Sequence, residues 1–175
     1  MPKRPHLPLL LLLIGSLSVW AACSRGGTDG RTEDEESARL ARGNEVSIER
    51  VRAAARALAE PGATVDYVAA EMEGVVKART KSQALLYYDG YRATLITPAS
   101  DQVTQINFDL SEAKPNVGQL TAVFGTPEAT PKGVLYRFET QATGATILIL
   151  AEPVSMPADE GSLVRRIVIE GARVR

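Results

Sequence analysis

The apolar residues from Glu45 onward recur with the period of an α-helix. They fall at positions i, i+3, i+7 and i+10 and form one stripe of a 3.6-residue repeat. They are Ile48, Val51, Ala55 and Leu58. We predict a helix that packs this stripe against a core and ends at Pro61-Gly62. The alternative is a basic amphipathic helix lying on anionic lipid, but the stripe carries no Trp or Phe to enter the headgroup region.

A second, short helix is predicted directly after this stop. Thr64 is suited to be its N-cap, because a threonine hydroxyl accepts a hydrogen bond from a backbone N–H of the first turn. Val65, Val68 and Met72 then face the core. Residues 75–83 are expected to form a linker or a further helical turn.

A β-hairpin is the clearest local pattern in the chain. Residues 84–88 and 91–97 flank Asp89-Gly90, a dipeptide typical of a two-residue type I′ turn. Residues 102–110 then alternate between apolar and polar side chains, which predicts a half-buried antiparallel strand.

The second half of the chain shows the same order of elements. Asn116 takes the place of Thr64 as an N-cap, and Val117, Leu120 and Phe124 follow at a similar spacing. Gly125-Thr126-Pro127 ends this helix, because glycine adopts the left-handed cap and proline cannot continue a helix. Three strands are predicted after it, at residues 134–140, 145–151 and 163–170.

These elements predict an α+β fold in which helices pack on one face of an antiparallel sheet. Residues 64–110 and 116–170 are interpreted as a tandem repeat of a short helix plus three strands. Leu120 and Phe124 are expected to pack from the second short helix. The predicted sheet core consists of Ile106, Phe108, Tyr136, Phe138, Ile147 and Ile169.

The beginning of the chain has the layout of a secretory signal. Lys3 and Arg4 precede an apolar run at residues 7–19, which is shorter than the roughly 20 residues of a membrane-spanning helix. The run closes on Ala21-Ala22-Cys23-Ser24, which resembles a bacterial lipoprotein box. The resemblance implies a signal peptide at 1–22 and acyl chains on Cys23, with palmitate among them. Trp20 departs from the aliphatic residue usual at its position.

Two other outcomes remain open for this segment. Cleavage after Ala21 would leave Cys23 as a free thiol, and an uncleaved segment would act as an anchor. Residues 23–44 are polar and acidic, and we predict a flexible tether there. A single α+β domain is expected at 45–175. Ser24, in second place after the cysteine, resembles the pattern of lipoproteins exported to the outer membrane.

Composition excludes several kinds of chemistry. Loss of Lys3 and Arg4 from the 20 basic residues leaves 18 against 21 acidic ones, a net charge of −3, which disfavours nucleic acid as a partner. His6 is the only histidine and Cys23 the only cysteine, so a chain from Cys23 has no Ser-His-Asp or Cys-His pair. We therefore predict no enzyme, no metal site and no cofactor; the alternative that composition leaves open is an enzyme that uses carboxylates or Ser/Thr alone.

A family resemblance can be drawn at residues 116–138. Leu120, Phe124-Gly125-Thr126-Pro127 and Tyr136, together with the lipoprotein box, resemble the SmpA/OmlA lipoproteins. These are small components of the outer-membrane β-barrel assembly machinery. The tandem layout is also similar to the β-lactamase-inhibitor-protein fold. The motif covers about one-seventh of the chain, which departs from the small lipoproteins in its leading helix and first half.

The resemblance implies a non-enzymatic lipoprotein at the periplasmic face of the outer membrane, held through lipid on Cys23 and binding another envelope protein. The alternative is an inhibitor-like or ligand-binding domain that acts on a soluble periplasmic target. Tyr88, Tyr91 and Arg92 at the hairpin tip are the candidate partner-binding residues, because Tyr and Arg are enriched where binding energy concentrates. The competing interpretation is a cross-strand aromatic pair that only stabilises the hairpin.

Overall fold

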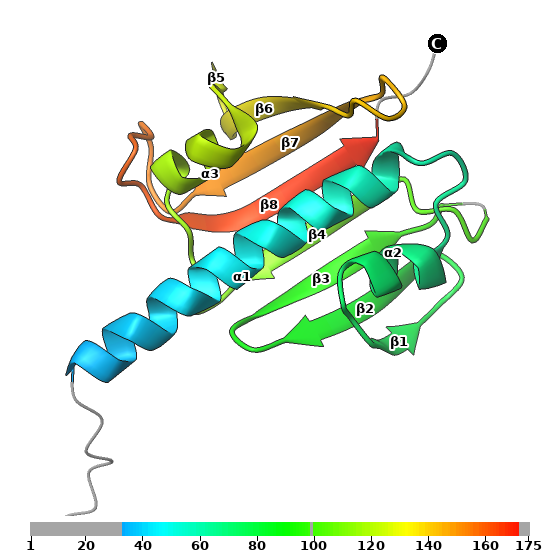
Figure 1. The fold of residues 1–175 in the computed structure, drawn as a ribbon, viewed down its shortest axis with the longest axis horizontal. Coiled ribbons are helices and arrows are strands. Elements are labelled where there is room, and N and C mark those ends of the chain that lie inside the picture. Colours follow the sequence, from blue (N-terminus) through cyan, green and yellow to red (C-terminus); the bar gives the residue numbers. More distant parts are fainter. Residues whose placement is uncertain (1–32, 99, 172–175) are drawn as a thin grey trace, which may run out of the picture. The chain divides into compact units, whose positions relative to one another are not determined.

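The computed structural model describes residues 33–98 and 100–171, and Cys23 lies outside them. The described part has the predicted α+β class: three helices and one eight-stranded antiparallel sheet (Figure 1). The strand order is β1-β2-β3-β4-β8-β7-β6-β5. The strands are β1 (Val76–Arg79), β2 (Gln83–Tyr88), β3 (Tyr91–Ile96), β4 (Gln105–Leu110), β5 (Glu128–Thr130), β6 (Gly133–Glu139), β7 (Thr146–Pro153) and β8 (Val164–Gly171).

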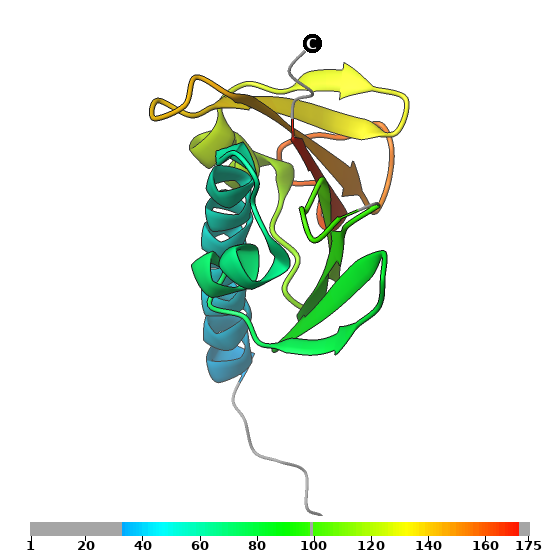
Figure 2. The same ribbon diagram turned by 90° about the vertical axis from the view of Figure 1, so that its right-hand side faces the viewer.

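The helices α1 (Glu33–Ala59), α2 (Val65–Glu71) and α3 (Val117–Phe124) lie on one side of the sheet (Figure 2). The predicted stripe of α1 is confirmed, since Ile48, Val51, Ala55 and Leu58 are all buried. Ala54 and Ala57 are buried with them. Small side chains along this stripe allow the helix backbone to approach the sheet closely.

The start of α1 corrects the prediction of a flexible tether at residues 23–44. Residues 33–44 are helical, and residues 23–32 lie outside the described part. Four acidic residues at 33–36 stand in the first turn, where negative charge interacts favourably with the helix dipole. The same acidic run predicts disorder by its composition, but its position at the N-terminus of α1 stabilises the helix.

Both short helices begin at the predicted N-caps. The Thr64 hydroxyl accepts from the Tyr67 N–H, and Asn116 forms a capping box with Gln119. Each cap residue also forms an isolated antiparallel bridge, Thr64 to Gln102 and Asn116 to Leu163. Each short helix is followed by four strands rather than the predicted three. The tandem repeat itself stays a prediction.

The extra strands explain this difference. Residues 75–83 were predicted as a linker or helical turn, which is wrong, because β1 occupies Val76–Arg79. β5 has only three residues and was not predicted. Both strands form the edges of the sheet and are largely exposed, so neither carries the alternating pattern that marks a strand in a sequence.

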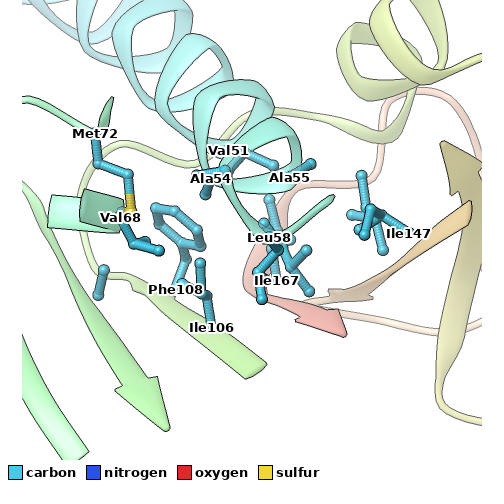
Figure 3. Packing of buried hydrophobic residues seen from close by; sticks show 14 of the residues in the cluster. Val51, Ala54, Ala55, Leu58, Val68, Met72, Ile106, Phe108, Ile147 and Ile167 are labelled. Atoms are coloured by element: carbon cyan, nitrogen blue, oxygen red, sulfur yellow. The ribbon is translucent and has the colours of Figure 1, made fainter. Parts of the chain in front are cut away.

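The core lies between the helices and the sheet (Figure 3). The prediction is confirmed for five sheet residues, each no more than 1% exposed: Ile106, Phe108, Tyr136, Ile147 and Ile169. Phe138 is only half-buried and packs against the margin of the core. Leu120 and Phe124 of α3 are buried as predicted.

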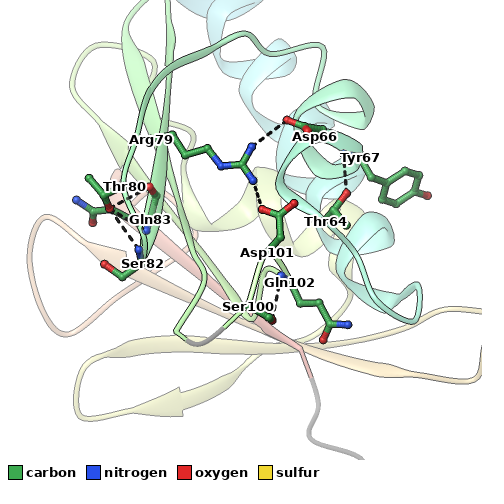
Figure 4. Close-up of polar contacts among 10 residues, drawn as sticks. All are labelled: Thr64, Asp66, Tyr67, Arg79, Thr80, Ser82, Gln83, Ser100, Asp101 and Gln102. Carbon is green, nitrogen blue, oxygen red and sulfur yellow. Dashed lines mark hydrogen bonds and ion pairs between the residues drawn. The ribbon is translucent and has the colours of Figure 1, made fainter.

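An ion-pair cluster ties the edge strand β1 to the rest of the fold (Figure 4). The Arg79 guanidinium pairs with Asp66 of α2, at 3.4 Å, and with Asp101 of the β3–β4 loop. These three segments are far apart in sequence, so one side chain fixes the placement of the edge strand.

Candidate functional site

The predicted hairpin is present, but its turn is not the predicted type I′. Tyr88 pairs with Tyr91 across Asp89-Gly90, and Gly90 has φ +80°. A type I′ turn needs positive φ at both central residues, whereas Glu73 is the only non-glycine residue of the described part with positive φ. The Gly90 carbonyl accepts hydrogen bonds from the N–H groups of Ser111 and Glu112. The turn therefore holds the connection between β4 and α3.

Tyr88 and Tyr91 face the helices. Their rings stack with centroids 4.8 Å apart, and the Arg50 guanidinium of α1 lies 4.5 Å above the Tyr88 ring. Arg50 donates to the Tyr91 hydroxyl at 2.7 Å and to the Met72 carbonyl at 3.2 Å, and the Tyr88 hydroxyl donates to the same carbonyl at 3.3 Å. Arg50, Met72, Tyr88 and Tyr91 form what we call the arginine–tyrosine joint.

The arginine–tyrosine joint connects α1, the end of α2 and the β2–β3 hairpin, and its two tyrosines are partly or fully shielded from water. Tyr91 is 5% exposed and Tyr88 is half-buried. Burial, reinforced by the neighbouring Tyr91, raises the pKa of Tyr88 to about 12. Gly74 leaves room for Tyr88, since a Cβ at Gly74 would lie 2.3 Å from the tyrosine hydroxyl oxygen. These contacts match the interpretation of the pair as a stabilising element of the hairpin.

Arg92 points to the opposite face of the sheet, together with Tyr87. These two residues lie directly across from each other in the β2–β3 ladder, and Tyr87 is 53% exposed. Arg92 donates to Asp109 of β4 at 2.8 Å. The structure thus separates the three candidate residues: Tyr88 and Tyr91 enter the joint, and Arg92 lies on the outer surface. Their role in binding a partner stays a prediction.

The larger candidate surface is the face of the sheet without helices, which we call the open face. The strand registers define a row of side chains that crosses all eight strands. In spatial order this row is Ala78, Leu85, Thr94, Asn107, Val168, Leu150, Leu135 and Glu128. Its larger apolar members, Leu85 on one side and Val168, Leu150 and Leu135 on the other, are half-buried, and Thr94 and Asn107 lie between them.

Four aliphatic side chains form a continuous group on this face. Leu135, Leu150 and Val168 are neighbours across β6, β7 and β8, and Leu148 lies two residues before Leu150 on the same face. We call these four residues the aliphatic patch. All four are half-buried although none of the three described helices covers them. A contiguous apolar group on an uncovered sheet surface is a candidate interaction site.

Charged residues of both signs border the aliphatic patch. The next row across the sheet places Arg92, Asp109, Arg166 and Glu152 in register, so positive and negative groups alternate. On the other side, Arg137 donates to Glu128 at 3.1 Å. The Arg166 Nε is shielded from solvent and has no hydrogen-bond partner in the structure. This border can pair with charges on a partner, which would favour one orientation.

Sequence reasoning did not predict the open face, although a signal for it was present. Residues 146–151 read Thr-Ile-Leu-Ile-Leu-Ala, with apolar residues at successive positions, whereas a strand with one face in water alternates. The run therefore indicates a strand with apolar side chains on both faces. We had used it only to predict the core.

The described residues contain neither a candidate metal site nor a candidate membrane-spanning helix. Across residues 33–98 and 100–171, no three His, Cys, Asp or Glu side chains gather so that they could hold a metal ion. No helix within these ranges combines the length and apolar character needed to cross a bilayer.

The chain was compared with protein-family models, with curated proteins and with solved structures. None of the three comparisons gave a significant match. The resemblance to the SmpA/OmlA lipoproteins and to the inhibitor-protein fold therefore stays a prediction.

Proposed function

We propose that this protein is a non-enzymatic envelope lipoprotein, anchored at the periplasmic face of the outer membrane through lipid on Cys23, that binds another envelope protein. The open face carries the proposal. In the part of the chain that the structure describes, the eight-stranded sheet has helices on one side only, and its other side bears the aliphatic patch bordered by charges of both signs. Such an apolar centre with a polar rim is the usual anatomy of a protein interface.

The order of elements along the chain fits this role. The candidate anchor Cys23 lies ten residues before the start of α1, and α1 packs on the inner side of the sheet. The helices of residues 33–171 therefore lie on one side, and none of them covers the open face.

The proposal is tested by affinity capture of the full chain from detergent extracts of envelopes, with mass spectrometry of the captured proteins. Leu150→Glu places a charge in the aliphatic patch, and we expect it to abolish capture of the partner. Thr146→Glu is the matched control, because it is on the same strand and face but outside the patch. Melting curves of both variants establish that the fold is retained.

The outcomes separate the proposed binding class from the alternative. A partner captured from the membrane fraction and lost with Leu150→Glu supports the proposal. Equal capture by the two variants overturns the assignment to the open face. A partner found only in the soluble periplasmic fraction favours the inhibitor-like domain.

A further inference from the structure

The loop between β7 and β8 exposes three large apolar side chains. Val154, Met156 and Leu163 are 56%, 52% and 49% exposed, and they are three of the seven exposed large hydrophobic residues of the described part. Val154 and Leu163 also face each other, since the Val154 N–H donates to the Leu163 carbonyl at 2.8 Å. We call these three residues the apolar tip.

The loop is held in place by the body of the protein, so its exposure does not come from fraying. The Gly118 N–H donates to the Glu160 carbonyl at 2.8 Å, and the Val117 N–H donates to the Ser162 carbonyl at 3.0 Å. Both donors belong to the first turn of α3. The Ser162 hydroxyl donates to Asp159 at 2.7 Å. The apolar tip is therefore a preformed surface.

The apolar tip lies at the end of the sheet that the first half of α1 contacts. Arg39 of α1 pairs with Glu112 at 3.6 Å, and Gly43 lies against Ala113. Two residues further on, the Pro115 carbonyl accepts from the N–H of Val164, at the start of β8. The first half of α1, the β4–α3 loop and the base of the apolar tip therefore lie at one end of the domain.

Covalent geometry limits how far this end can be from a lipid on Cys23. The ten residue steps from Cys23 to Glu33 span at most about 35 Å in any conformation. The helical steps from Glu33 to Gly43 add about 15 Å at a rise of about 1.5 Å per residue. A domain held on so short a chain can touch the membrane, and the end that carries the apolar tip is within this reach.

We propose that the apolar tip rests on the membrane surface, with Val154, Met156 and Leu163 among the lipid headgroups and upper acyl chains. The inference depends on the anchor proposed above. A short tether gives an effective concentration on the order of millimolar, so a contact too weak to hold a free protein is enough. The aliphatic patch and its partner then stay beside the membrane in one orientation.

The charges of the loop keep this contact shallow. The carboxylate of Asp159 accepts from Ser162, which lowers its pKa and keeps it ionised. Glu160 is also exposed, and Arg165 is exposed at the start of β8. The two carboxylates of the loop outnumber this one cation, so charge does not attract the loop to an anionic lipid surface, and apolar contact supplies the binding. Added salt should therefore not weaken it.

The chain allows a direct test that does not depend on lipidation in the cell. The protein from Cys23 onward has one cysteine and no tryptophan, because the only Trp is Trp20. Its thiol is coupled to maleimide lipid in vesicles of phosphatidylethanolamine and phosphatidylglycerol. Met156→Trp then supplies a single fluorophore in the apolar tip. Ala142→Trp, in the exposed turn between β6 and β7 at the opposite end, is the matched control.

We expect tethering to shift the Met156→Trp emission to the blue and to make it quenchable by brominated acyl chains. The Ala142→Trp emission should stay unchanged. Adding Val154→Asp and Leu163→Asp to Met156→Trp should abolish the shift, while the melting temperature shows that the fold is retained. Equal quenching at positions 156 and 142, or a shift that survives both substitutions, overturns the proposal. Loss of protein capture with those two substitutions but no quenching would instead assign the apolar tip to a protein partner.

Discussion

At the scale of residues, Arg50 has the largest structural role among the charged side chains of α1. Its guanidinium donates to the Met72 carbonyl at the end of α2 and to the Tyr91 hydroxyl of the hairpin. It also stacks over the face of the Tyr88 ring. A guanidinium can serve all three contacts because its N–H donors spread in one plane that also stacks on aromatic rings. The joint therefore depends on one side chain with several partners.

Replacing this guanidinium should destabilise the domain. Arg50→Ala leaves the Tyr91 hydroxyl and the Met72 carbonyl without their charged donor, so we expect a loss of about 2–3 kcal/mol in the free energy of unfolding. Arg56→Ala is the control, because Arg56 is exposed and makes no ion pair in the described structure; its effect should stay within about 0.5 kcal/mol. Urea denaturation measures both. Similar losses for the two variants would contradict the role given to Arg50.

The raised pKa of Tyr88 predicts a loss of stability in alkali. The pKa is about 12 in the folded chain against about 10 when unfolded, so the folded state holds the proton more tightly. The stabilisation is complete below about pH 10 and disappears as the pH rises through about 12. With a discount for partial exposure, we expect about 1–2 kcal/mol. Tyr88→Phe should flatten the dependence of the melting temperature on pH over this window, and an unchanged dependence would refute the prediction.

The sequence identified Tyr88, Tyr91 and Arg92 as notable residues but not the directions of their side chains. Alternation along β2 and β3 could have separated Arg92 from the two tyrosines, because neighbours in a strand point to opposite faces. The contact with Arg50 could not be predicted, since it joins residues 41 positions apart and depends on how α1 crosses the sheet.

At the scale of elements, periodicity predicted the segments that bury a face and missed those that do not. The buried stripe of α1 and the caps of α2 and α3 were predicted from local patterns and short-range chemistry. The strands β1 and β5 were missed because they are short edges with mostly exposed side chains. The open face was missed because a strand that is apolar on both sides resembles one buried between two layers.

The packing of α3 can be tested through Phe124. Its ring is 7% exposed and lies 6.0 Å from Tyr136 and 5.8 Å from Phe138, measured between ring centroids. Phe124→Ala should cost about 3–5 kcal/mol of unfolding free energy. Phe138→Ala should cost less, because Phe138 is only half-buried. Thermal and urea unfolding report both values, and an equal or smaller loss for Phe124→Ala would mean that α3 contributes little to the core.

At the scale of the whole molecule, the fold class followed from the sequence and the function did not. Alternating strands and short capped helices are enough to predict a layered α+β domain. A partner, by contrast, is recognised by a surface that forms only when distant strands join. The open face places Asn107 of β4 beside Val168 of β8, and no local pattern in the sequence records that pairing.

The anchor of the whole molecule is tested at Cys23. Intact-mass measurement of the envelope form should show loss of residues 1–22 together with added acyl mass. Cys23→Ala should remove that mass and release the domain from the membrane fraction. A durable anchor needs more than one acyl chain, and this variant has no site for any of them. A chain beginning at Ala22 with a free thiol would contradict the prediction. Recovery in the inner-membrane fraction would correct only the choice of membrane.

The strand order also has a consequence for how the domain assembles. β1–β4 and β5–β8 are each built from neighbouring antiparallel strands, and the two sets join only where β4 pairs with β8. Contacts between strands close in sequence form quickly, whereas the β4–β8 pairing joins segments about sixty residues apart and includes the last of the described strands. A chain that emerges from a translocation channel amino end first can form its first meander early. Such a chain exposes the unpaired edge of β4 until Val164–Gly171 has arrived, which is the interval in which it is most prone to aggregate.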